Sequence, residues 1–260
     1  MDELALAKEL AEIGAEISMR HYSPEVHTSV KKDGSIVTIA DREIEKAMRR
    51  RINEVFPDHA ILGEEGGLEG DPSSPMWILD PIDGTNNYAS GIPVFGNLIA
   101  LRVEGRMEVG VINAPALGEL YEAARGGGAF MNGQRIQVSE ISSMTEATVC
   151  FGSYKRMLKR GYREQVENLV LSSRRDRSFG DFWGHMLVAR GAVEAMAEPN
   201  LNIWDVAAVE VIVEEAGGKT SGFGGEHYPE SRVLTRDQGE GSFLSTNGAL
   251  HDEMVRVLGK

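Results

Sequence analysis

Two aspartates at the end of an apolar run are the feature that most constrains this chain. Residues 76–79 read MWIL, and residues 80–85, DPIDGT, follow them directly. Asp, Pro and Gly are common turn formers, so a turn explains the residue types. A turn does not, however, require two carboxylates at this spacing. We therefore expect Asp80 and Asp83 to hold a ligand at a strand-to-turn junction.

Three further acids stand where predicted helices or strands begin or end. Asp41 and Asp205 lie at the starts of predicted helices, where they could act as caps. Glu64 follows a short predicted strand and could be an exposed loop acid. Each residue alone has such a structural explanation. Together the acids form a set at points where the chain changes direction: Asp41, Glu64, Asp80, Asp83 and Asp205.

Several carboxylates can share one pocket only if cations neutralise them, because like charges about 4 Å apart raise each other's pKa strongly. Oxygen ligands without a Cys or His cluster favour Mg²⁺ over zinc. Gly84 and Thr85 add backbone N–H groups at a turn, which can receive a phosphate oxygen as a helix N-terminus does. This combination indicates metal-assisted hydrolysis of a phosphate ester.

The composition is that of a globular enzyme, with 42% hydrophobic and 26% charged residues among 260. A net charge of −13 argues against nucleic acid or an anionic membrane as a partner. The single cysteine, Cys150, excludes an intramolecular disulfide and a Cys-rich zinc site, and its apolar neighbours predict a core strand. No targeting signal and no apolar run near 18 residues is visible, so we expect a cytoplasmic protein.

Hydrophobic periodicity predicts the elements of the first half. An amphipathic helix is expected over residues 3–21, and a second helix ends before Pro57. A short strand at 60–62 opens into a glycine-rich turn. Strands then dominate residues 94–138, with a hairpin turn at Glu104-Gly105.

The second half alternates strands and helices. We expect a strand at 147–151, helices at 154–172 and 182–190, a strand at 192–197, and a helix that starts near Trp204. Because both halves contain groups of strands and groups of helices, the pattern favours an α+β layered sandwich, with alternating helix and sheet layers, over a doubly wound fold.

These motifs resemble those of the inositol monophosphatase family of Mg²⁺-dependent, lithium-sensitive phosphatases, and the resemblance covers essentially the whole chain. Its specific signal is DPIDGT at 80–85 followed by WDVAA at 204–208. Further similar segments are residues 37–41, 63–65, 126–133 and 215–218. The resemblance implies the layered fold that the family shares with fructose-1,6-bisphosphatase.

The same resemblance implies one phosphatase domain over residues 1–260. Within it we expect a subdomain over 1–145 with the metal and catalytic motifs, and a subdomain over 146–260 with the specificity segment and the last metal ligand. The family also implies a homodimer and a small-molecule phosphate ester as the partner.

The resemblance implies a role for each acid. Glu64, Asp80 and the Ile82 carbonyl would hold one Mg²⁺ ion. Asp80, Asp83 and Asp205 would hold a second, and a third could bind near the polar loop at 31–35. Asp41 and Glu64 would act with Thr85 to orient and deprotonate the attacking water. The amides of Gly84 and Thr85 would bind the phosphate, and in-line attack would displace the alcohol.

Substrate choice is expected to depend on residues 180–183, GDFW, and on Glu198. Inositol phosphatases of the family usually have a small Gly/Ser-Ala-Ala segment there, whereas GDFW resembles the histidinol-phosphatase branch. Histidinol phosphate carries an ammonium and an imidazole, with which Asp181 and Glu198 could pair. Arg177 could meet phosphate or orient one of these acids. Helix packing is the alternative explanation for the two aromatic residues.

The leading hypothesis is a Mg²⁺-dependent histidinol-phosphate phosphatase of histidine biosynthesis. An inositol-1-monophosphatase or fructose-1,6-bisphosphatase of the same family is the alternative enzyme. A regulatory member that acts by binding protein is the alternative of another class, which the intact ligands and Thr85 disfavour. The expected substrate contacts are Glu64, Ile82, Asp83, Gly84, Thr85, Arg177, Asp181, Glu198 and Asp205.

Overall fold

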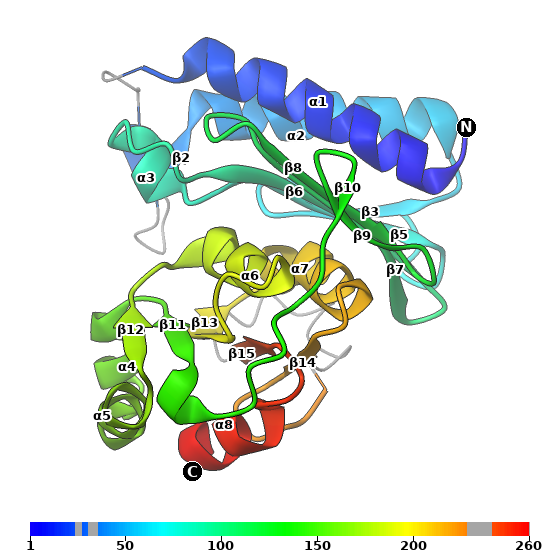
Figure 1. The fold of residues 1–260 in the computed structure, drawn as a ribbon. Coiled ribbons are helices and arrows are strands. Elements are labelled where there is room, and N and C mark those ends of the chain that lie inside the picture. Colours follow the sequence, from blue (N-terminus) through cyan, green and yellow to red (C-terminus); the bar gives the residue numbers. More distant parts are fainter. Residues whose placement is uncertain (24–27, 31–35, 228–240, 260) are drawn as a thin grey trace.

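The computed structural model describes residues 1–23, 28–30, 36–227 and 241–259. Two sheets and three groups of helices stack in the order helix, sheet, helix, sheet, helix (Figure 1). The alternating layers confirm the α+β sandwich predicted from the sequence. Within the described residues, no helix combines the length and the apolar character that crossing a bilayer requires.

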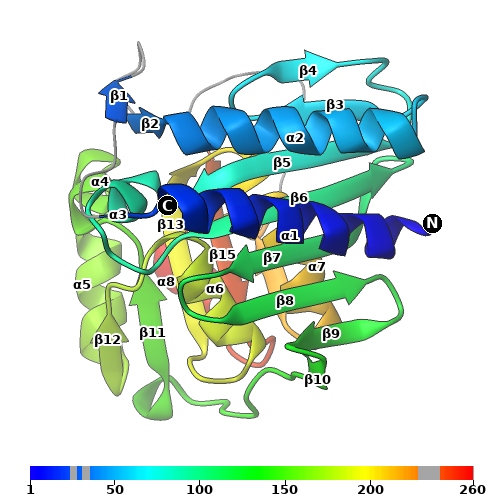
Figure 2. The same ribbon diagram turned by 90° about the horizontal axis from the view of Figure 1, so that it is seen from above.

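The first layer consists of α1 (Glu3–His21), which has the predicted bounds, and α2 (Ile39–Val55), which ends before Pro57 as predicted. They lie side by side over one face of the first sheet and run roughly along its strands (Figure 2). Leu10 of α1 and Ile44 and Ile52 of α2 are fully buried between the helices and the sheet. The apolar stripes seen in the sequence therefore face one core.

The first sheet has eight strands in the order β10-β9-β8-β7-β6-β5-β3-β4, and its neighbours are antiparallel except for the parallel pair β3 and β5. The predicted hairpin is confirmed, since Glu104 and Gly105 have φ of 49° and 83° and join β6 to β7. The strands are β3 (Ala60–Gly63), β4 (Gly67–Glu69), β5 (Met76–Asp83), β6 (Gly96–Val103), β7 (Arg106–Ala114), β8 (Glu119–Ala124), β9 (Gly128–Met131) and β10 (Gln134–Arg135). A separate antiparallel pair is formed by β1 (Thr28–Val30) and β2 (Ile36–Thr38).

The middle layer consists of α6 (Asp181–Ala189) and α7 (Ile203–Glu215). Both sheets cover α7, which explains why its sequence is apolar on nearly every side. At Gly110 of β7 the sheet approaches this helix very closely, because a Cβ there would lie 2.5 Å from the carbonyl oxygen of Ala208. The absent side chain thus sets the distance between α7 and the first sheet.

The second sheet has five strands in the order β12-β11-β13-β15-β14. As expected, Cys150 is a buried strand residue, and it lies in β11. The strands are β11 (Thr148–Phe151), β12 (Arg175–Arg177), β13 (Ala195–Leu201), β14 (Lys219–Ser221) and β15 (Gly241–Thr246). The last helix layer contains α4 (Tyr154–Lys159), α5 (Arg163–Ser172) and α8 (His251–Leu258), and the remaining short helices are α3 (Thr85–Ala89) and a 3₁₀ turn (Met144–Glu146).

Two predicted boundaries were wrong. The helix expected over 154–172 is two helices, because Gly161, with a φ of 76°, turns the chain between α4 and α5. The strand expected at 192–197 begins only at Ala195, because Gly191 (φ 70°) and the following residue complete the turn after α6.

The predicted division between residues 145 and 146 falls in the connection between the two sheets. The helices α6 and α7 nevertheless pack against both sheets. A division into two subdomains therefore stays a prediction.

Replacing Gly110→Ala should destabilise the protein by about 1–3 kcal/mol, because the added methyl group must push α7 away from the sheet. Urea unfolding measures the change. Gly180→Ala is the control: its Cβ would meet only ordinary contacts at 3.7 Å or more, and its φ of −90° suits alanine. Equal stability of the two variants would contradict the close approach.

Candidate active site

An irregularity in β5 brings Asp80 and Asp83 to one place. Residues three apart on a regular strand point to opposite faces. Here the pairing with β6 shifts register between the two aspartates, where Pro81 and Ile82 stand. The buried Asn97 of β6 donates its Nδ2 hydrogen to the Pro81 carbonyl at 2.5 Å and so supports the irregular step.

Asp205 joins the two aspartates from the first turn of α7. Carboxylate oxygens of Asp80, Asp83 and Asp205 all lie within 4.8 Å of one another. One oxygen of Asp205 accepts the Asn202 N–H at 2.6 Å, and one oxygen of Asp83 accepts the Phe182 N–H at 2.6 Å. The starts of α7 and α6 therefore both face the cluster, and their dipoles favour negative charge there.

Glu64 reaches the cluster because β3 runs parallel to β5. It directly follows β3, and its N–H donates to the Leu79 carbonyl at 3.2 Å, one residue before Asp80. Burial raises the pKa values of Asp80 and Asp205, and the negative charge of Glu64 raises both further. The acid that sequence reasoning also explained as an exposed loop residue thus lies beside the predicted ligands.

Asp41 is held by the capping box of α2. One of its oxygens accepts the N–H and the hydroxyl of Thr38, at 2.8 and 2.6 Å. Burial raises the pKa of Asp41 to about 7; the Thr38 hydrogen bonds oppose that shift and the Glu64 charge adds to it. The helix-cap role and a place near the acids are therefore both correct for this residue.

The buried acids have the properties of a cation site. Burial raises the pKa of Asp205 to about 7, and it raises the pKa values of Asp80 and Asp83 well above their ordinary range, with neighbouring acids adding to each shift. Oδ1 of Asp80 and Oδ1 of Asp41 are buried without a hydrogen-bond partner among the described residues. A divalent cation would satisfy the oxygens and remove the repulsion, and an all-oxygen donor set suits Mg²⁺.

Gly84 and Thr85 form the turn behind the two aspartates. Gly84 has a φ of 80°, and a Cβ there would lie 2.9 Å from the Val94 carbonyl, so both the backbone angle and the space require glycine. Thr85 opens α3, and its hydroxyl donates to the Ile82 carbonyl at 2.9 Å. The turn thus has the conformation expected from the sequence.

Two of the expected specificity residues lie together next to the cluster. Glu198 of β13 is 2% exposed, and one of its oxygens accepts the Asp181 N–H at 3.1 Å. Burial, reinforced by the Asp181 charge, raises the pKa of Glu198 to about 8. Asp181 also adds to the raised pKa of Asp83. The acids therefore extend the negative site beyond the three clustered aspartates.

Sequence reasoning missed two partners of these acids. The Arg156 guanidinium pairs with Glu198 at 3.4 Å, and the Asn87 amide donates to Asp181 at 3.2 Å. Asp181 has a φ of 57°, which is uncommon for a residue with a side chain and often marks a functional position. The basic residues at 155–160 were the available signal for Arg156, but no local pattern indicates that Arg156 pairs with Glu198.

The other expected residues take different places. Arg177 ends the edge strand β12 with an exposed side chain that donates to the Asp176 carbonyl at 2.7 Å. Phe182 is buried in the core, and Trp183 donates to Glu119 at 3.1 Å, so both aromatic residues serve packing as the alternative proposed. The expected third-metal loop at 31–35 lies outside the described residues.

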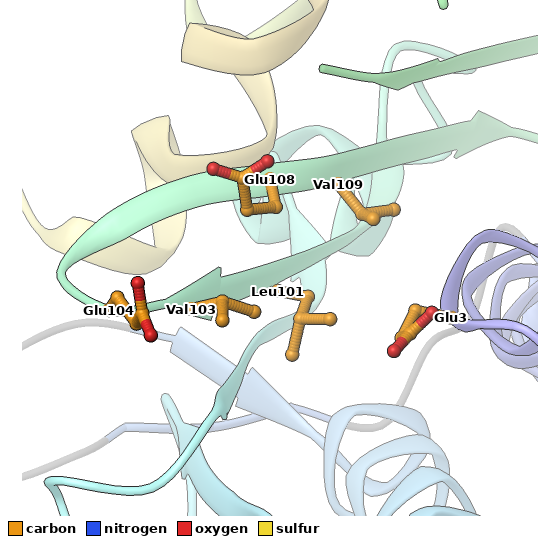
Figure 3. A pocket seen from close by; sticks show the side chains of 6 residues that line it. All are labelled: Glu3, Leu101, Val103, Glu104, Glu108 and Val109. Atoms are coloured by element: carbon orange, nitrogen blue, oxygen red, sulfur yellow. The ribbon is translucent and has the colours of Figure 1, made fainter. Parts of the chain in front are cut away.

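A separate cavity of 380 Å³ opens at the turn between β6 and β7, beside the start of α1 (Figure 3). Its lining residues are Glu3, Leu101, Val103, Glu104, Glu108 and Val109. None of the clustered acids contributes to it, and β6 runs from Gly96, opposite Asp83, to Leu101 and Val103 at this cavity. It is therefore distinct from the acidic site.

Comparison with known proteins shows the class of protein. Residues 1–258 match the model of the inositol monophosphatase family. A histidinol-phosphatase of Chlorobaculum parvum is 40% identical, with 99% of this chain and 96% of that protein covered. A histidinol-phosphatase of Mycobacterium tuberculosis is 38% identical, with 99% and 98% covered. The solved structure of a Thermotoga maritima IMPase is 35% identical, with a TM-score of 0.87 over 99% of this chain and 97% of that one.

The chain therefore belongs to the inositol monophosphatase family and has its fold, which confirms the resemblance seen in the motifs. Within that class, its similarity to the histidinol-phosphatases makes it a phosphoric monoester hydrolase. The acidic cluster is the place where such an enzyme could hold its metal.

The metal-free protein should lose thermal stability as pH rises from about 4 to about 7. Asp41 and Asp205 have a pKa of about 7 in the folded state and 3.8 ordinarily, so between these values the folded state binds more protons than the unfolded state. Raising the pH then favours unfolding. Mg²⁺ should remove most of this loss, which thermal unfolding in EDTA and in Mg²⁺ measures.

Asp205→Asn is the control for this prediction, because asparagine keeps the acceptor for Asn202 but carries no charge. The variant should be more stable than the wild type at high pH in EDTA, and Mg²⁺ should stabilise it less. A wild-type protein whose unfolding temperature in EDTA is independent of pH over this range would contradict the repulsion between the acids.

Proposed function

We propose that this protein is a Mg²⁺-dependent histidinol-phosphate phosphatase, which hydrolyses L-histidinol phosphate to L-histidinol and phosphate. The observation that carries the proposal is the pair of the buried Glu198 and the half-buried Asp181, placed beside the three clustered aspartates. A substrate with a phosphate at one end and cationic groups at the other matches an acidic site that continues past its metal ligands. The named activities of the two histidinol-phosphatase relatives support the same substrate.

In this proposal the ligands to Mg²⁺ are Glu64, Asp80, the Ile82 carbonyl, Asp83 and Asp205. Bound Mg²⁺ supplies charge neutralisation and a lowered pKa for water. The carboxylates of Asp41 and Glu64, with the Thr85 hydroxyl, orient the attacking water and accept its proton. The N–H groups of Gly84 and Thr85 donate to phosphate oxygens and hold the phosphorus in line with that water.

Asp181 and Glu198 have the task of binding the amino and imidazole groups of the substrate. Arg156 neutralises part of the Glu198 charge in the substrate-free protein. A substrate ammonium at this place would form charge-assisted hydrogen bonds to the same carboxylates. Inositol offers only hydroxyl groups, which gain less from two buried acids.

Phosphate release from histidinol phosphate, inositol 1-phosphate and fructose 1,6-bisphosphate, each with Mg²⁺ and with EDTA, tests the proposal. We expect kcat/KM to be at least about tenfold higher for histidinol phosphate, which corresponds to about 1.4 kcal/mol. A preference for inositol 1-phosphate would overturn the substrate assignment. Full activity in EDTA, or in Asp83→Asn, would overturn the metal mechanism.

Asp181→Asn should lower kcat/KM for histidinol phosphate by about 10- to 100-fold, the range expected when a charged hydrogen bond of about 1.5–3 kcal/mol is lost. β-Glycerophosphate, which has no cation, is the matched substrate and should be affected much less. Asp176→Asn is the matched variant, because this aspartate is near Asp181 in sequence but lies on the edge strand β12, where its carbonyl accepts from Arg177. Equal losses on the two substrates would contradict a cation-binding role for Asp181.

Inositol-1-phosphatase activity is the second candidate function. The full-length similarity to the Thermotoga maritima IMPase favours it. The substrate panel above separates it from histidinol phosphatase. Lithium sensitivity, the homodimer and the cytoplasmic location stay predictions from the family resemblance and the sequence.

A further inference from the structure

A buried carboxylate outside the acidic cluster holds the segment that carries Glu64. Glu45 lies one helical turn after Asp41 on α2 and is only 2% exposed. Its Oε2 accepts the Glu65 N–H and its Oε1 accepts the Gly66 N–H, both at 2.7 Å. Both amides belong to residues that directly follow Glu64.

The segment is shaped to fit this carboxylate. A Cβ at Gly63 would lie 2.4 Å from the Glu45 carboxyl carbon, and a Cβ at Gly66 would lie 2.7 Å from its Oε1. Side chains at these two positions would displace the backbone from Glu45. The two glycines that enclose Glu64 and Glu65 are therefore explained by the contact with Glu45, a reason that the sequence alone did not reveal.

Arg49 closes the arrangement from the next turn of α2. Its Nε donates to Oε1 of Glu45 at 2.8 Å, and its Nη2 donates to the Gly67 carbonyl at 2.5 Å. Glu45 thus faces three N–H donors, two from the segment and one from Arg49. Each of the two carboxylate oxygens therefore has at least one N–H donor, and the Arg49 guanidinium pairs with the buried acid.

We infer that Glu45 is a positioning residue, which fixes the backbone on both sides of Glu64 and thereby aims the Glu64 carboxylate at the metal site. The inference rests on the proposed metal role of Glu64. One face of α2 then carries Asp41, which approaches the cluster itself, and Glu45, which holds a neighbour of the cluster. Residues that orient ligands in this way typically change metal affinity or activity by about 10- to 100-fold when they are replaced.

Glu45→Gln tests the inference. The Gln side chain has nearly the same shape, but its NH₂ group must face at least one of the three N–H donors. We expect Mg²⁺ affinity, measured by titration calorimetry, to weaken by about tenfold. Amide exchange over residues 63–67 should become faster in the metal-free protein, and excess Mg²⁺ should restore most of the lost kcat.

Glu194→Gln is the matched control. Glu194 is also buried, at 3% exposure, and its oxygens accept the Thr148 N–H at 2.6 Å and the Ser139 hydroxyl at 2.8 Å. Glu194 directly precedes β13, at the opposite end of the strand from Asn202 and the acidic cluster. The Glu194→Gln substitution should therefore lower the unfolding temperature without changing Mg²⁺ affinity. Wild-type Mg²⁺ affinity in Glu45→Gln, with a stability loss like that of the control, would overturn the inference.

Arg49→Met provides a milder variant if Glu45→Gln does not fold. It keeps the two backbone contacts of Glu45 and removes only the guanidinium, so Mg²⁺ affinity should fall in the same direction by a smaller factor. Unchanged affinity in this variant would count against the inference. If the wild-type protein binds no Mg²⁺, the proposed function is refuted, and the role of Glu45 with it. If the wild-type protein binds Mg²⁺, and Glu64→Gln weakens that binding but Glu45→Gln does not, only the role of Glu45 is refuted.

Discussion

The repulsion between buried carboxylates is the constraint on which the rest of the structure depends. Asp80, Asp83 and Asp205 each place an oxygen within 4.8 Å of the others, Asp80 buried and the other two partly exposed, and burial and mutual repulsion both favour their protonation. The three side chains stay close together only if the surrounding backbone prevents them from moving apart. The irregular step in β5, the starts of α6 and α7, and the parallel strand β3 provide that restraint.

Backbone N–H groups are the main means by which the chain holds its acids. Asp83, Asp205 and Asp41 each accept an amide hydrogen at 2.8 Å or less, and Glu45 accepts two. An amide donor holds a carboxylate oxygen without bringing a positive side chain into the metal site. Glu198 also accepts a backbone N–H, but there Arg156 adds a charge that a cationic substrate could replace. The distinction matches the proposed division between metal ligands and substrate contacts.

Local sequence patterns predicted the helices and the acids well. The apolar stripes of α1 and α2 and the motif at 80–85 depend on neighbours in the chain, so their structure could be expected from the residues themselves. The three-residue edge strands β4, β12 and β14 lack enough alternation to be recognised. The roles of Glu45 and Arg156 were not predicted, because their partners are distant in sequence. A single acid on a helix, or a single base in a polar stretch, has no distinguishing pattern.

The order of the ligands along the chain has a consequence for assembly. Asp80 and Asp83 lie on β5 and Glu64 directly follows the neighbouring β3 of the first sheet, whereas Asp205 lies in a helix that comes after β11, β12 and β13 of the second sheet. A partly folded chain that has formed only the first sheet therefore lacks Asp205, the proposed metal ligand that α7 contributes. Metal bound by all of these acids would join the two sheets through the middle helix layer, and it would favour the fully assembled state over every intermediate. The cation proposed for catalysis would then also stabilise the completely folded protein.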